Sequence, residues 1–174
     1  MFKFFKKNDE PKPAPAAARA PAPAAVAANS GGIQFYPDLI KNLVGDHRRL
    51  FQLYDNIKEN FSRRDLALVS GSLKEFGALV RNHLLTENMR LYIYLQQQMA
   101  KDEINTALVR SYRKEMDGIG KNVLDFLEKY KEIESSSAAD LSSFAAELDE
   151  IGRVVGGRMK REEETLYPLY VAKY

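Results

Sequence analysis

The sequence predicts an all-α protein: an up-down-up-down antiparallel four-helix bundle preceded by a disordered N-terminal tail. Apolar residues recur at alternating spacings of three and four in four successive segments after residue 37, the pattern of helices with one buried face. Short connections join these segments and favour antiparallel neighbours. No strand alternation, internal repeat or glycine-rich phosphate loop competes with this interpretation.

Residues 1–32 are expected to lie outside the fold, and residues 33–174 to form the bundle. Residues 11–28 hold five prolines and ten alanines, a composition that favours an extended linker. The first seven residues mix phenylalanine and lysine but are too short for a signal peptide or a membrane span. Two roles stay open for this tail: a solubilising segment, or a weak contact with a membrane surface or a partner protein.

Composition excludes several classes of protein. With 174 residues and 45% hydrophobic content, the chain can bury one core. It has no cysteine, which excludes disulfides, thiolate metal sites and cysteine nucleophiles, and we expect a cytoplasmic location. The net charge of +2 is nearly neutral, so we expect no nucleic-acid partner.

The first two helices follow directly from this periodicity. The first is expected to begin at Pro37 and Asp38, which precede an apolar run. Its inward positions are Ile40, Leu43, His47, Leu50, Tyr54, Ile57 and Phe61. The second is expected from Leu66 or Ser72 to Met99. Its inward positions are Leu73, Phe76, Val80, His83, Glu87, Leu91 and Tyr94.

The third helix is expected from about Asp102 to Ile133. Its inward positions are Leu108, Tyr112, Met116, Ile119, Val123, Phe126 and Tyr130. The fourth follows a polar break at residues 135–137, with Asp140 as the expected cap and Pro168 as its end or bend. Its inward positions are Leu141, Phe144, Leu148, Ile151, Val155, Arg158, Glu162 and Leu166. The residues after Pro168 are expected to cover one end of the bundle.

Polar side chains interrupt these inward faces at comparable depths, so we expect them to meet in one layer. They are His47, His83, Glu87, Arg158 and Glu162. An imidazole and a carboxylate four residues apart project from one helix face, and an imidazole on a facing helix can meet them. The pattern therefore predicts a metal site, or the remnant of one, inside the bundle.

At these residues the sequence resembles the hemerythrin-like HHE family, four-helix bundles that hold a di-iron centre with histidines and bridging carboxylates. The matching segments are Asp46-His47-Arg48-Arg49-Leu50, His83 with Glu87 and Leu91-Tyr92, and Glu162 to Pro168. They span nearly all of residues 38–170. The resemblance implies that His47, His83, Glu87 and Glu162 are the ligands of one iron, the two carboxylates also being the bridges. Glu163 is the alternative to Glu162, because family members differ by one residue in that spacing.

The second half of such a site is missing. Where the family places the histidines of the second iron, this chain has Met116 and Arg158. A thioether is a poor ligand for an oxygen-rich iron site, and a guanidinium does not deprotonate to coordinate a metal. The sequence therefore predicts a degenerate metal layer that is at most mononuclear.

Two interpretations of this layer stay open. In one, a single Fe(II), Mn(II) or Zn(II) ion is bound, and Arg158 offsets surplus negative charge. In the other, the protein is metal-free, and Arg158 pairs with Glu87 and Glu162 in an internal ion network. Both follow because two carboxylates facing each other in a low-dielectric core require a cation.

For function, we expect a sensor or protein-interaction module with a protein partner in signalling or transcription, and no enzyme. The serines at 135–137 and 142–143 have no histidine to serve as their base. An alternative is a regulator that binds the principal sigma factor of RNA polymerase, because residues 148–163 resemble the final helix of the Rsd/AlgQ family. On that alternative the polar layer is structural, and an outer surface binds the sigma factor.

Overall fold

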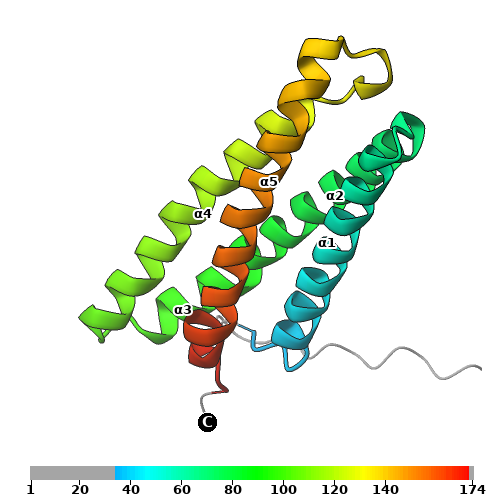
Figure 1. The fold of residues 1–174 in the computed structure, drawn as a ribbon. Coiled ribbons are helices and arrows are strands. Elements are labelled where there is room, and N and C mark those ends of the chain that lie inside the picture. Colours follow the sequence, from blue (N-terminus) through cyan, green and yellow to red (C-terminus); the bar gives the residue numbers. More distant parts are fainter. Residues whose placement is uncertain (1–33, 173–174) are drawn as a thin grey trace, which may run out of the picture. The chain divides into compact units, whose positions relative to one another are not determined.

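The computed structural model describes residues 34–172, and every regular element in that range is helical (Figure 1). Four long helical stretches follow one another along the chain. They are α1 (Leu39–Ser62); α2 (Leu66–Thr86) with η1 (Glu87–Tyr92) and α3 (Ile93–Gln98); α4 (Glu103–Lys129); and α5 (Ala138–Arg161) with η3 (Glu162–Leu166) and η4 (Tyr167–Leu169). A short 3₁₀ turn, η2 (Ile133–Ser135), lies between α4 and α5. The predicted tail, residues 1–32, lies outside the described residues.

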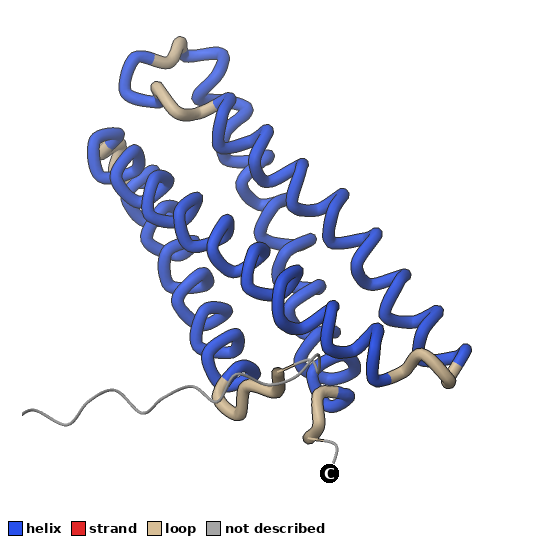
Figure 2. Tube along the Cα trace, turned by 180° about the vertical axis from the view of Figure 1, so that it is seen from behind, coloured by secondary structure: helices blue, strands red, loops and turns tan. Residues whose placement is uncertain are grey.

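These stretches form the predicted bundle. Successive stretches reverse direction at short connections, and α1 lies beside α2 along its length (Figures 1 and 2). Contacts between α2 and α4, α4 and α5, and α1 and α5 close the bundle. The fold class predicted from periodicity is thus confirmed for the described residues. None of their helices is both long enough and apolar enough to cross a membrane.

Local chemistry fixes most helix starts. The side chains of Asp65 and Asp102 accept hydrogen bonds from backbone N–H groups three residues ahead, which satisfies otherwise unpaired donors. The prediction that Asp140 caps the last helix is wrong by three residues. Ser137 is the cap, and Asp140 closes a capping box by accepting from the backbone of Ser137. The short η2 turn also replaces the expected end of the third helix, since α4 ends at Lys129.

The core consists of two apolar clusters, one on each side of the polar layer. The larger is formed by the following buried residues: Leu50, Leu53, Ile57, Val69, Leu73, Phe76, Val80, Ile119, Val123, Phe126, Leu127, Tyr130, Ile133, Phe144, Leu148 and Met159. The smaller is formed by Leu39, Leu43, Leu91, Tyr92, Tyr94, Leu95, Val109, Tyr112, Leu166, Tyr167 and Tyr170. His47, between Leu43 and Leu50 on α1, therefore lies where the two clusters meet.

The segment after Pro168 covers the end of the smaller cluster, as expected. The ring of Tyr170 stacks on Phe35 with centroids 4.9 Å apart, and its hydroxyl accepts a 2.8 Å hydrogen bond from the backbone N–H of Tyr36. The hydroxyl of Tyr94 donates to the carbonyl of Val171 at 2.7 Å. The two ends of the described chain are thereby tied together, which closes the bundle below the polar layer.

Candidate metal centre

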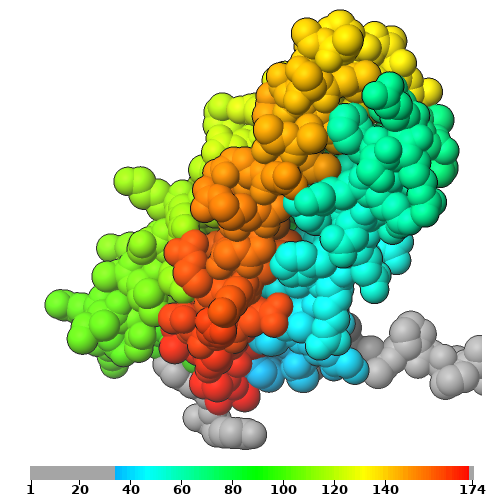
Figure 3. Space-filling view, viewed as in Figure 1, coloured from blue at the N-terminus to red at the C-terminus, as the bar shows by residue number. Residues whose placement is uncertain are grey.

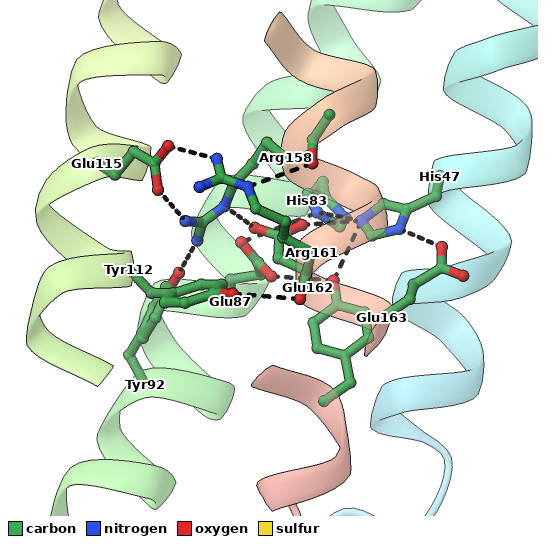
Figure 4. A network of polar contacts seen from close by, with 12 residues as sticks. His47, His83, Glu87, Tyr92, Tyr112, Glu115, Arg158, Arg161, Glu162 and Glu163 are labelled. Atoms are coloured by element: carbon green, nitrogen blue, oxygen red, sulfur yellow. Dashed lines mark hydrogen bonds and ion pairs between the residues drawn. The ribbon is translucent and has the colours of Figure 1, made fainter. Parts of the chain in front are cut away.

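Two histidines and two glutamates converge from three helical stretches (Figure 4). Nε2 of His47, on α1, lies 3.3 Å from Nε2 of His83, on α2, and 3.3 Å from Oε2 of Glu162, at the start of η3. Oε2 of Glu87 lies 3.9 Å from Nε2 of His83. All four side chains are buried, and the donor atoms of His47, His83 and Glu162 lie within 4.8 Å of one another. The predicted layer therefore exists, with its donors directed at a common point.

Each imidazole is held through its other ring nitrogen. Nδ1 of His47 lies 2.7 Å from Oε1 of Glu163, and Nδ1 of His83 lies 3.4 Å from Oδ2 of Asp46. Metal binding requires a deprotonated Nε2, and an Nδ1–H that donates to each carboxylate then leaves the lone pair of each Nε2 directed inward. Glu163, which the sequence offered as an alternative to Glu162 as a metal ligand, thus lies on the outer side of His47. Asp46, which sequence reasoning did not select, occupies the same position on His83.

The hydroxyl of Tyr167 also points into the group. It donates a 3.0 Å hydrogen bond to Oε1 of Glu87 and lies 3.1 Å from Nε2 of His47. Burial and the neighbouring charge of Glu87 raise the pKa of Tyr167, so the phenol is protonated at neutral pH in the absence of a metal. The sequence did not predict this contact. Tyr167 lies within the segment Glu162 to Pro168 that resembles the family, but no role was assigned to it.

Arg158 fills the other half of the layer. Its guanidinium is buried and donates through all three nitrogens: Nε to Oε1 of Glu162 at 2.6 Å, one terminal nitrogen to Glu115 at 3.0 Å, and the other to the hydroxyl of Tyr92 at 2.8 Å. The group also lies over the ring of Tyr112, 4.4 Å from its centroid. Each of the three guanidinium nitrogens of Arg158 therefore has a hydrogen-bond partner.

Met116 lies beside this arginine, as the sequence predicted. It is half-buried and, with His83, Arg158 and Glu162, lines a cavity of about 20 Å³. A cavity of this size holds about one water molecule. Since the chain has no histidines besides His47 and His83, the second half of the layer contains a guanidinium and a thioether in place of imidazoles.

The two inward carboxylates differ electrostatically. Burial, together with the negative charge of Glu162, raises the pKa of Glu87 to about 7. Burial also opposes ionisation of Glu162, but the hydrogen bond with His47 and the charge of Arg158 outweigh it and lower the pKa of Glu162. Oε2 of Glu87 is buried and has no hydrogen-bond partner. Glu87 is therefore the carboxylate that lacks a compensating positive group.

The residues fit a single metal ion. Bonds of about 2.1 Å from a metal to nitrogen or oxygen place neighbouring ligands about 3.0–3.4 Å apart. The 3.3 Å separations between His47 and His83 and between His47 and Glu162 match this range, and the unpaired oxygen of Glu87 lies 3.9 Å from Nε2 of His83. Imidazole and carboxylate donors suit iron, manganese or zinc. The half of the layer that contains the two histidines can thus hold a metal cation, whereas in the other half the cation is the side chain of Arg158.

Local helix geometry explains why a tyrosine shares the inward face with each of these glutamates. Glu87 and Glu162 each begin a π-helical turn, and the backbone N–H of Tyr167 bonds to the carbonyl of Glu162. Residues i and i+5 lie about 140° apart around an α-helix, whereas a π-turn bonded from i to i+5 brings residue i+5 onto the same face as residue i, as i and i+4 are in an α-helix. Each turn therefore presents a glutamate and a tyrosine on one face: Glu87 with Tyr92, and Glu162 with Tyr167.

A helical bundle with a buried His/His/Glu group of this kind defines a class, the metal-binding helical-bundle proteins. The family model described as the hemerythrin HHE cation-binding domain matches residues 38–170. The chain therefore belongs to the hemerythrin HHE cation-binding domain family. Comparison with curated proteins and with solved structures returned no significant match. The resemblance to Rsd/AlgQ regulators stays a prediction.

Proposed function

We propose that this domain binds one metal ion per chain and acts as a sensor rather than as an enzyme. The ion would be held by His47, His83, Glu87 and Glu162. The observation that carries this proposal is the buried group of His47, His83 and Glu162, beside which Oε2 of Glu87 lies 3.9 Å from Nε2 of His83 without a hydrogen-bond partner. An unpaired buried carboxylate oxygen is costly, and a bound cation removes that cost.

The same geometry supports a site for one ion. In a dinuclear centre, Glu162 would use its second oxygen for the second metal, but here that oxygen accepts from Nε of Arg158. A second cation would have to approach a buried guanidinium that is already fixed by Glu115 and Tyr92. Two positive groups at such distances repel strongly where water is excluded. Arg158 therefore replaces the second metal electrostatically.

The metal-free alternative leaves the position of Glu87 in the polar layer unexplained. In that alternative Arg158 supplies the buried permanent positive charge among the described residues, and its guanidinium nitrogens donate to Glu162, Glu115 and Tyr92. No hydrogen bond from Arg158 reaches Glu87. The arrangement of this half of the layer thus favours the interpretation with one bound ion of iron, manganese or zinc.

The size of the site supports a sensing role. The cavity beside His83 and Glu162 has a volume of about one water molecule, which favours a water-sized ligand over an organic substrate. A bound ion would supply a Lewis-acidic position for such a ligand. Metal binding would also stabilise the folded domain, since only the folded chain brings these ligands together. We propose that a protein partner responds to this change.

The proposal is tested by titrating Fe(II), without oxygen, or Zn(II) into chelator-treated protein and following heat and thermal unfolding. The wild-type chain is expected to bind about one equivalent and to unfold at a higher temperature when loaded. His83→Ala is expected to lose both effects. Glu164→Ala is the matched control, because Glu164 lies in η3 but is exposed. Absence of binding in the wild type, or equal binding in His83→Ala, would contradict the proposal.

A further inference from the structure

The hydroxyl of Tyr167 is as close to the donor atoms of the proposed site as those atoms are to one another. Its separations of 3.0 Å from Oε1 of Glu87 and 3.1 Å from Nε2 of His47 compare with 3.3 Å between the two imidazoles. Tyr167 is only 3% exposed, and its ring lies nearly parallel to that of His47. The hydroxyl is therefore part of the ring of donors around the common point, although it belongs to none of the four expected ligands.

The position of this hydroxyl is fixed by the backbone. The π-turn η3 carries Tyr167 onto the face of Glu162, and Pro168 follows in the 3₁₀ turn η4. The equivalent tyrosine of the other π-turn, Tyr92, is also buried, but its hydroxyl accepts from Arg158 instead. The two π-turns thus place one tyrosine hydroxyl in each half of the layer, one beside the guanidinium and one beside the proposed metal position.

We propose that Tyr167 is a fifth protein ligand that binds iron directly through its phenolate oxygen and favours the ferric ion. This inference rests on the proposed function, since it concerns the same metal. When Fe(III) binds, the O–H bond of Tyr167 breaks, an iron–oxygen bond forms, and the proton passes to solvent, as ligand protons do when a metal binds. No electron is transferred in this step.

Charge balance supports the ferric preference. Glu87 and Glu162 carry two negative charges and Arg158 one positive charge, so the buried groups sum to −1 when both carboxylates are ionised. Fe(II) brings this sum to +1, whereas Fe(III) with the same ligands would bring it to +2. A phenolate returns the ferric form to +1. The outer carboxylates of Asp46, Glu163 and Glu115 add negative charge equally in both oxidation states. A phenolate bound directly to the ion favours Fe(III) over Fe(II), because its attraction grows with the charge of the ion.

The test compares the full-length wild-type chain with Tyr167→Phe and Tyr92→Phe after loading with Fe(III) supplied as its citrate complex. Both substitutions keep the ring and remove one buried hydroxyl, so Tyr92→Phe is the matched control. The readouts are iron content, visible absorption and resonance Raman spectra. We expect phenolate-to-iron charge transfer, with tyrosine ring vibrations enhanced in that band, in the wild type and in Tyr92→Phe only. Ferric affinity should fall at least about tenfold in Tyr167→Phe.

Two outcomes would overturn the inference, and they are distinguishable from each other. Wild-type protein that contains iron but has no tyrosinate vibrations, or whose spectrum is unchanged in Tyr167→Phe, overturns ligation by Tyr167 and leaves the proposed metal site intact. Wild-type protein that takes up none of Fe(III), Fe(II), Mn(II) and Zn(II) overturns both. Circular dichroism of each variant separates loss of a ligand from loss of the fold.

Discussion

Glu162 shares its carboxylate between two buried groups: Oε1 accepts from Nε of Arg158 at 2.6 Å, and Oε2 lies 3.3 Å from Nε2 of His47. The carboxylate therefore joins a permanent cation to the proposed metal position. This relationship gives the layer its asymmetry, because one half is neutralised by a side chain of the protein and the other half contains Glu87 without a partner for Oε2.

Replacing Arg158 is expected to destabilise the metal-free protein strongly. Arg158→Met removes the positive partner of Glu162 and leaves that carboxylate buried, which costs about 3–5 kcal/mol of unfolding free energy. Arg153→Met is the control, since Arg153 pairs with Glu150 at the surface and contributes less than about 1 kcal/mol. Urea unfolding of both variants measures the difference. Equal effects would show that Arg158 is not the charge that balances this layer.

The carboxylates behind the histidines are expected to tune the metal site without forming it. Asp46→Ala and Glu163→Ala remove the partners of Nδ1 on His83 and His47, so each should weaken metal affinity about 10–100-fold. Competition with a chelator of known affinity measures this change, and Asp55→Ala, at an exposed site on α1, is the control. The number of ions bound per chain should not change. Unaltered affinity in both variants would contradict this role.

The stability of the metal-free protein is expected to depend on pH through Glu87. Its pKa in the folded protein is about 7, because burial and then Glu162 raise it from 4.5. Between these two values the folded state binds the proton more strongly than the unfolded state, so this group makes stability fall as pH rises through that interval. Metal affinity should rise over the same interval, because the proton competes with the metal.

Glu87→Gln tests this pH dependence directly. The amide does not ionise, so the contribution of residue 87 to the slope of stability against pH disappears. The unfolding free energy of the variant should therefore increase relative to that of the wild type as pH rises from 4.5 to 7. Urea unfolding in the presence of a chelator, at several pH values, gives this comparison. Parallel pH profiles for the two proteins would refute the assignment to Glu87.

The contact between α1 and α5 supplies a test of packing away from the site. These helices lie against each other on the face seen in Figure 3, and a Cβ atom added to Gly152 would lie 2.4 Å from Cζ of Tyr54. Gly152→Ala should therefore cost about 1–3 kcal/mol of stability. Gly157→Ala, which meets no atom within 4 Å, should stabilise the helix by about 0.5–1 kcal/mol. Thermal unfolding of the two variants is expected to shift in opposite directions.

Periodicity was sufficient to predict the bundle and the convergence of His47, His83, Glu87, Arg158 and Glu162. Each of these residues replaces an apolar side chain on an inward face, so its direction follows from helix geometry alone. The separation of the two Nε2 atoms, 3.3 Å, agrees with that prediction. The short connections likewise indicated the antiparallel order of the helices.

The surrounding partners were not predictable in the same way. Tyr167 lies five residues after Glu162, a spacing that points away from the layer in an α-helix and toward it only because η3 is a π-turn. Asp46 and Glu115 reach residues on other helices, and their half-buried positions carry no periodic signal. Tertiary geometry, rather than local pattern, selects these residues.

The number of metal ions per chain, measured by elemental analysis of protein purified without chelator and then reloaded with Fe(II), tests the central claim most directly. We predict about one ion per chain in the wild type and none in His83→Ala. Two ions per wild-type chain would contradict the replacement of the second metal by Arg158, and none after reloading would contradict the metal site itself.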